Sequence, residues 1–88
     1  MGSFVEVGTM EQKIKQDIHI GANIRRIRKE QGIGQTELVR LLQLAGVEMT
    51  RETLVKIERE TQHIQASQLR GIRDALHTTY NALLAENE

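Results

Sequence analysis

The stretch GQTELVRLLQLAGVEMTRETLVKIERE, from Gly34 to Glu60, carries the pattern that decides the fold. Its apolar residues recur at intervals of three and four, which is the spacing of the buried face of an α-helix. In the first half, Glu37 would lie in the first turn of a helix, where the helix dipole favours a negative charge. Gly46 follows the last apolar residue and marks the end of that helix. The apolar positions between them are Leu38, Leu41, Leu42 and Ala45. The first half of the stretch therefore predicts one helix.

The second half predicts another helix over about residues 51 to 60, because Thr50 is a favourable N-cap at its start. Only Leu54 and Ile57 can face a protein core. With roughly 100° between successive residues, the opposite side of this helix carries long polar side chains. They belong to Arg51, Glu52, Lys56 and Arg59. Such a polar side is either a solvated surface or the binding surface for a polar partner.

Three more helices are predicted by apolar residues at the same spacing. They are Ile20, Ile24 and Ile27; Leu69, Ile72 and Leu76; and Tyr80, Leu83 and Leu84. Gly32 ends the first of these helices, and Thr79 can cap the last. Gly21 should interrupt any helix that continues into the first one from an earlier segment. The chain has no proline and no apolar alternation of period two. We therefore expect an all-α fold, a compact five-helix bundle.

The pattern divides the chain into three parts. Residues 1–19 are expected to be a leader that is partly flexible or helical, in which TMEQ, from Thr9 to Gln12, could be a capping box. Residues 20–85 form the domain, and residues 86–88 are a C-terminal tail. One domain is the default for 88 residues, since a domain of this size buries only about 60 to 65% of the surface of its unfolded chain.

The composition excludes several classes of protein. There is no cysteine, so disulfide-stapled scaffolds are excluded and a reducing compartment fits. No apolar run approaches the ~18 residues of a membrane span, and the first residues lack the apolar block of a signal peptide. We therefore expect a cytoplasmic protein with no membrane partner.

No catalytic, metal or cofactor site can be read from the sequence. His19, His63 and His77 lack the spacing of metal ligands, and no cysteine joins them. The two serines, Ser3 and Ser67, have no His and Asp context, and no glycine-rich phosphate loop is present. We expect neither an enzyme nor a bound cofactor, and no small-molecule ligand is implied.

The formal net charge is zero, with 12 basic and 12 acidic residues, but the charges are unevenly distributed. Residues 21–85 carry ten basic and seven acidic residues, and four of the basic ones lie in RRIRK at 25–29. Arg25 or Arg26 could therefore contact a phosphate group. Only two residues are aromatic, so a platform for stacking unpaired bases is missing. If the partner is a nucleic acid, we expect a duplex.

Two opposite charges fall at the edges of apolar helix faces. Arg28 lies at the edge of the isoleucine row of its helix, and Glu58 lies beside the face that carries Leu54 and Ile57. Because both apolar faces must turn toward one core, Arg28 and Glu58 are expected to form a structural pair.

Several separate motifs make residues 20–85 resemble the helix-turn-helix domains of the phage repressor and Cro (XRE) family. The motifs are IRRIRKEQGIGQTELVRLL, MTRETLVKIERE and LRGIRDALHTTYNALL, in the order typical of that family. The resemblance implies a lambda-repressor-like fold whose third helix enters the major groove of duplex DNA. It also implies an internal pair between Arg28 and Glu58. The DNA-binding positions that it implies are Gln35, Thr36, Thr50, Arg51, Glu52, Thr53, Lys56 and Arg59.

The resemblance assigns different roles to these positions. Gln35 is expected to hold a backbone phosphate at the start of its helix. Arg51 and Lys56 can reach the acceptors of guanine, and Glu52 can accept from the amino group of cytosine. The chain departs from the family at QLAGVEM, which is longer than the tightest connections, so the helix before it should be longer. It also departs at Glu60, where glycine is usual.

We therefore expect a sequence-specific regulator of transcription, a repressor, that binds double-stranded DNA as a homodimer. The apolar residues available for pairing two copies are Tyr80, Leu83 and Leu84. The alternative is an XRE-like protein-interaction module or antitoxin whose main partner is a protein. Zero net charge and the acidic residues Glu52, Glu58 and Glu60 around the third helix favour this alternative.

Overall fold

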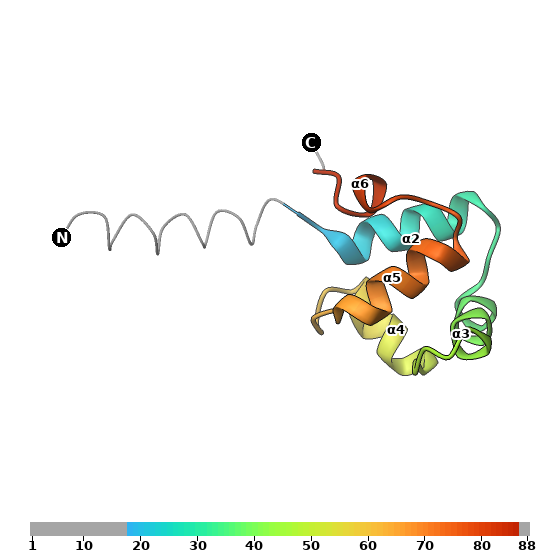
Figure 1. The fold of residues 1–88 in the computed structure, drawn as a ribbon. Helices are drawn as coiled ribbons and strands as arrows, with labels where there is room; N and C mark the ends of the chain where they lie inside the picture. Colours follow the sequence, from blue (N-terminus) through green and yellow to red (C-terminus); the bar gives the residue numbers. More distant parts are fainter. Residues whose placement is uncertain (1–17, 87–88) are drawn as a thin grey trace, which may run out of the picture.

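The computed structural model describes residues 18–86, and within this range the chain forms five helices and no strand (Figure 1). The helices are α2 (Ile20–Glu30), α3 (Gln35–Leu44), α4 (Arg51–Glu58), α5 (Ala66–Ala75) and α6 (Tyr80–Leu83). The prediction of an all-α fold with five helices is confirmed for these residues. Residues 1–17 of the expected leader at 1–19, with the capping box from Thr9 to Gln12, lie outside the described residues.

The two ends of the described range meet beside α2. Ile18 and Glu86 form an isolated antiparallel bridge, so the fold includes one or two residues on each side of the expected domain at 20–85. Gly21 lies within the first turn of α2 and is buried. A Cβ atom at Gly21 would lie 2.0 Å from the carbonyl oxygen of Ile57, so a glycine is required for α4 to end this close to α2.

Hydroxyl caps begin two of the helices where the sequence predicts them. The Thr50 hydroxyl accepts a hydrogen bond from the backbone N–H of Thr53 (3.1 Å), and the Thr79 hydroxyl accepts one from Ala82 (3.1 Å). Each bond satisfies an N–H group that has no partner inside its helix. Gly34 precedes α3 and offers no such side chain, so the first N–H groups of α3 lack a side-chain cap.

Four helices end in the same way, with a residue in the left-handed conformation two positions after the helix. These residues are Gly32 (φ 70°), Gly46 (φ 84°), Glu60 (φ 64°) and His77 (φ 52°). After α4, the N–H of Glu60 bonds to the carbonyl of Ile57 and that of Thr61 to the carbonyl of Lys56, both at 3.0 Å. This is a Schellman motif. It ends α4 at Glu58, two residues before the expected end at residue 60.

The core is built from the predicted apolar faces, but a few residues differ from those expected. Its buried side chains are Ile24, Ile27, Leu38, Val39, Leu42, Met49, Leu54, Ile57, Ile72, Leu76 and Leu83. Met49 and Val39 were not expected there. Leu41 and Leu69 are only half-buried, and Ala45 is exposed because it is the cap that follows the last turn of α3.

Helix α2 lies between α4 and α6. It contacts α4 on one side and α6 on the other, while α3 contacts both α4 and α5 (Figure 1). Helix α4 is thus packed against α2 and α3 at once, and its remaining side is open. None of the helices within residues 18–86 has the length and apolar character needed to cross a membrane.

Candidate functional site

Helix α4 is anchored in the core by its two aliphatic side chains. Leu54 and Ile57 are 0% and 2% exposed. Burying an aliphatic side chain of this size contributes about 1.5 to 3 kcal/mol. The cap at Thr50 fixes the first turn, and the Thr50 hydroxyl also lies 3.0 Å from that of Thr53. The side chains on the outer side of α4 therefore project from a well-held support.

The outer side of α4 is polar and exposed. Arg51, Glu52 and Lys56 face solvent on the helix, and Arg59 does so directly after it. The ion pairs found within residues 18–86 involve other side chains, namely His19–Glu60, Arg26–Glu30, Arg28–Glu58 and Arg73–Asp74. In this part of the chain, the charged groups on the outer side of α4 are therefore free to meet a partner.

Arg28 and Glu58, which were expected to pair, form a bidentate ion pair between α2 and α4. The Nε of Arg28 donates to Oε2 of Glu58 at 2.8 Å, and its Nη2 donates to Oε1 at 2.9 Å. Both side chains are almost fully buried, at 7% and 2% exposed. The Nη1 of Arg28 also donates to the carbonyl of Ile33, before α3 begins (2.9 Å). One guanidinium group thus holds α2, α4 and the start of α3 together.

Gln35 lies beside this pair at the start of α3. Its amide nitrogen donates to Oε1 of Glu58 (3.1 Å), and the residue is half-buried. The expected role of Gln35 was to hold a backbone phosphate. One of its two amide hydrogens is engaged by Glu58, so only the other is free for that purpose. Thr36, the next expected position, is exposed.

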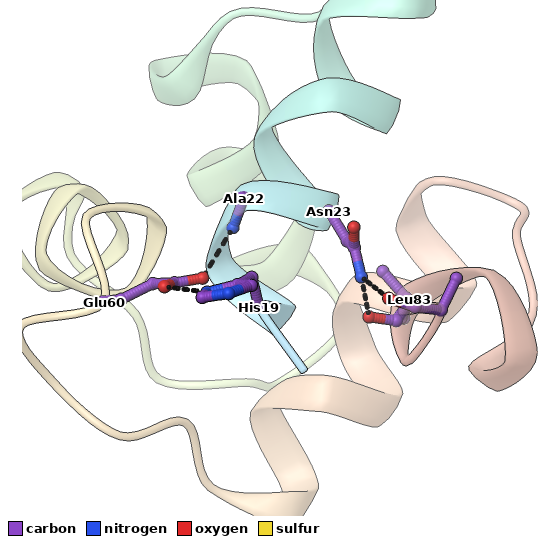
Figure 2. A network of polar contacts seen from close by, with 6 residues as sticks. His19, Ala22, Asn23, Glu60 and Leu83 are labelled. Carbon is purple, nitrogen blue, oxygen red and sulfur yellow. Dashed lines mark hydrogen bonds and ion pairs between the residues drawn. The ribbon is translucent and has the colours of Figure 1, made fainter. Parts of the chain in front are cut away.

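Glu60 joins the end of α4 to the first turn of α2, a contact that sequence reasoning missed. One carboxylate oxygen lies 2.9 Å from Nδ1 of His19, and the other accepts a hydrogen bond from the N–H of Ala22 (3.2 Å) (Figure 2). An acidic group at this end of α2 is favoured by the helix dipole. The sequence marks Glu60 as a departure from the glycine usual in the family that the chain resembles, but this departure does not indicate which groups Glu60 contacts.

Asn23 makes the matching connection on the other side of α2. Its amide nitrogen donates to the carbonyl oxygens of Leu83 (2.8 Å) and Ala85 (2.9 Å). Figure 2 shows Asn23 and Leu83 on the side of α2 opposite Glu60. Asn23 is fully buried, and its side-chain oxygen has no partner among the described residues. An asparagine within a row of buried isoleucines was a readable signal for this polar contact.

The side chains expected to pair two copies of the chain are only partly available. Leu83 is fully buried in the core, whereas Tyr80 and Leu84 are each 37% exposed. The guanidinium carbon of Arg73 lies 4.5 Å from the centre of the Tyr80 ring, so part of that ring is covered. Leu83 is therefore a core residue and not a surface residue for pairing.

The chain matches no protein-family model, no curated protein and no solved structure. No group of three or more potential ligands that could hold a metal ion occurs in the described range 18–86. The most distinctive surface is the outer side of α4, with Arg51, Glu52 and Lys56, which can donate to and accept from the polar edges of a partner.

Proposed function

We propose that the protein is a sequence-specific regulator that binds duplex DNA and represses transcription. In this proposal, α3 and α4 form a lambda-repressor-like helix-turn-helix, and α4 lies in the major groove. The observation that carries the proposal is the outer side of α4, where Glu52 and Lys56 are exposed on a helix whose opposite side is anchored in the core. An α-helix fits the major groove, and these side chains match the donor and acceptor groups found there.

The contacts around Glu58 support this proposal. A reading helix must hold its angle to the rest of the protein, because base contacts depend on its position in the groove. Arg28 ties α4 to α2, and Gln35 ties it to the start of α3, through the same carboxylate. The helix that would read the bases and the helix that would contact the backbone are therefore connected by one buried network.

The test is selection of bound sequences from random duplex DNA. We expect a common site to be enriched, and we expect binding to weaken steeply as salt rises, because counterions released from phosphates drive such binding. Binding that depends on salt but enriches no site would leave only nonspecific association. That outcome would contradict sequence-specific regulation.

A second candidate function is a protein-interaction module, such as an antitoxin subunit. The observation that favours it is Leu44, which is 75% exposed at the end of α3. Acidic groups near α4 and the zero net charge also fit a protein partner. Heparin chromatography separates the two functions. Retention that falls with salt supports DNA binding, and absence of retention at low salt supports the protein partner.

A further inference from the structure

A polar hollow of about 350 Å³ lies where α2, α4 and the start of α3 meet. Its lining residues are Arg25, Gln35, Arg51, Val55, Glu58 and Arg59. Three of these residues are arginines, and each is exposed, so their guanidinium groups can reach the mouth of the hollow.

The hollow divides the polar side of α4 into two sets of side chains. Arg51, Val55 and Arg59 are spaced four residues apart, so they follow one line along the helix, and all three line the hollow. Glu52 and Lys56, one position further along the chain, are exposed but do not line it. Arg51 therefore lies beside the hollow, whereas Glu52 and Lys56 lie outside it.

The charges around the hollow favour an anion. Glu58 is the acidic residue of the lining, and the buried guanidinium of Arg28 already neutralises it through two hydrogen bonds. No ion pair within residues 18–86 involves Arg25, Arg51 or Arg59. Like charges that share a hollow repel one another, and an anion with several oxygens relieves this repulsion while accepting charge-assisted hydrogen bonds from each guanidinium.

The start of α3 adds neutral donors at the same place. Gln35 lines the hollow and is the first residue of α3, which begins after Gly34 without a side-chain cap. The first N–H groups of a helix have no partners inside it and carry a partial positive charge. An anion in the hollow would lie beside Gln35, the first residue of α3, as well as beside the arginines.

We propose that this hollow holds one phosphodiester group of the DNA backbone, with Arg25, Arg51 and Arg59 as its ligands. The inference rests on the proposed function and changes the role of one residue. Arg51, whose position implied a contact with guanine, positions the protein on any duplex, and sequence is read by Glu52 and Lys56. Tetrahedral phosphate oxygens can be shared among several guanidinium groups, which a single base edge cannot achieve.

The test compares Arg51→Gln with Lys56→Gln on the selected site and on a scrambled duplex. Arg51→Gln should weaken both complexes by the same factor, about tenfold, because it removes a charge-assisted hydrogen bond to a group present in every sequence. Lys56→Gln should weaken the selected site more than the scrambled one. Arg70→Gln, an exposed arginine on α5 that does not line the hollow, is the matched control and should change neither.

The salt dependence provides a second readout. Since the three arginines share one phosphate, the triple variant Arg25→Gln, Arg51→Gln, Arg59→Gln should lower the slope of log affinity against log salt by about one, not three. A decrease of about three would mean three separate phosphates and would overturn the shared site. A change in the ratio of the two affinities on Arg51→Gln would show that Arg51 reads bases, which also overturns it.

A titration without DNA separates this inference from the proposed function. Inorganic phosphate added to the free protein should shift the Nε–Hε NMR signals of Arg25, Arg51 and Arg59 together, and leave that of Arg70 in place. If the triple variant binds the duplex as well as the unaltered protein does, the hollow does not hold a backbone phosphate. The proposed function would still stand. If inorganic phosphate shifts these arginine signals but the protein binds no duplex, both the proposed function and the binding of a DNA phosphodiester would be refuted. The hollow would then be a site for free phosphate.

Discussion

Arg28 and Glu58 join α2 to α4 through two hydrogen bonds of 2.8 and 2.9 Å inside the protein. Burying two charges is costly, and their attraction offsets this cost only while both partners are present. The pair therefore makes the fold sensitive to the loss of either side chain, although it need not be more stabilising than two apolar residues would be.

Glu58→Ala should lower the free energy of unfolding by about 3 to 5 kcal/mol, because it leaves the buried guanidinium of Arg28 without its partner. The matched control is Glu30→Ala. Glu30 pairs with Arg26 at 3.5 Å on the surface, and its loss should change stability by about 0.5 kcal/mol or less. Urea denaturation measures the free energy of unfolding of both variants. A double-mutant cycle on Arg28 and Glu58 that gives no coupling energy would contradict the prediction.

Gly21→Ala should destabilise the fold, because the added Cβ would lie 2.0 Å from the carbonyl oxygen of Ile57, and a backbone atom cannot turn aside as a side chain can. We expect a loss of about 1 to 3 kcal/mol from this overpacking. Gly34→Ala is the control, since nothing lies within 4 Å of a Cβ at that position. Equal thermal midpoints for the two variants would mean that α4 does not end against α2 as described.

His77 and Glu60 both adopt left-handed backbone conformations, with φ of 52° and 64°. A side chain in this conformation costs roughly 1 to 2 kcal/mol, which glycine avoids, although glycine also loses more entropy on folding. His77→Gly should therefore stabilise the protein by up to about 1 kcal/mol. Glu60→Gly relieves the same strain but loses the contacts to His19 and Ala22, so it should stabilise less or destabilise. Equal gains in chemical denaturation would show that these contacts contribute nothing.

The sequence predicts the helices and the core because both depend on local spacing. The period of three and four places Leu54 and Ile57 inside, and the same geometry places Arg28 and Glu58 at the edges of neighbouring faces. The short connections leave few ways to arrange such helices, so the all-α fold follows from the pattern.

The contacts at the end of α4 could not be predicted in the same way. The approach of Ile57 to Gly21 and the contact of Glu60 with His19 join positions that are far apart in the chain. They depend on the packing angle between α2 and α4, which apolar spacing does not determine. The same limit applies to the candidate site. A helical projection groups Arg51 with Lys56, and only the neighbouring helices show that Arg51 lines the hollow while Lys56 does not.

Two copies of the protein should bind one operator, with half-sites about one turn of DNA apart. Since Leu83 is in the core, the exposed parts of Tyr80 and Leu84 are the apolar groups that α6 can offer to a partner copy. Leu84→Glu should reduce dimer formation in sedimentation experiments. Leu44→Glu, at an exposed position on α3, is the control and should leave dimer formation unchanged. Monomers in free solution, with one protein bound per operator, would contradict the prediction.

Lys56 and Glu52 should determine sequence preference, whereas Gln35 should act on all duplexes alike. On the selected site, Lys56→Ala and Glu52→Ala should each cost about 1 to 3 kcal/mol, because a donor or acceptor on a base edge loses its partner. On scrambled DNA, Glu52→Ala should cost least, since an acidic side chain gains nothing from phosphates. Gln35→Ala should weaken both complexes by similar factors, because its free amide hydrogen is expected to contact the DNA backbone, which is the same in every sequence.

The deciding quantity is the ratio of the affinities for the selected and scrambled duplexes at one fixed salt concentration. Lys56→Ala and Glu52→Ala should lower this ratio, and Gln35→Ala should leave it unchanged while lowering both affinities. Each variant is first checked for an unchanged unfolding midpoint, which matters most for Gln35 because its amide also bonds to Glu58. If the ratio is the same for all three variants and the unaltered protein, α4 does not read the bases. The exposed Leu44 surface and a protein partner would then explain the chain better.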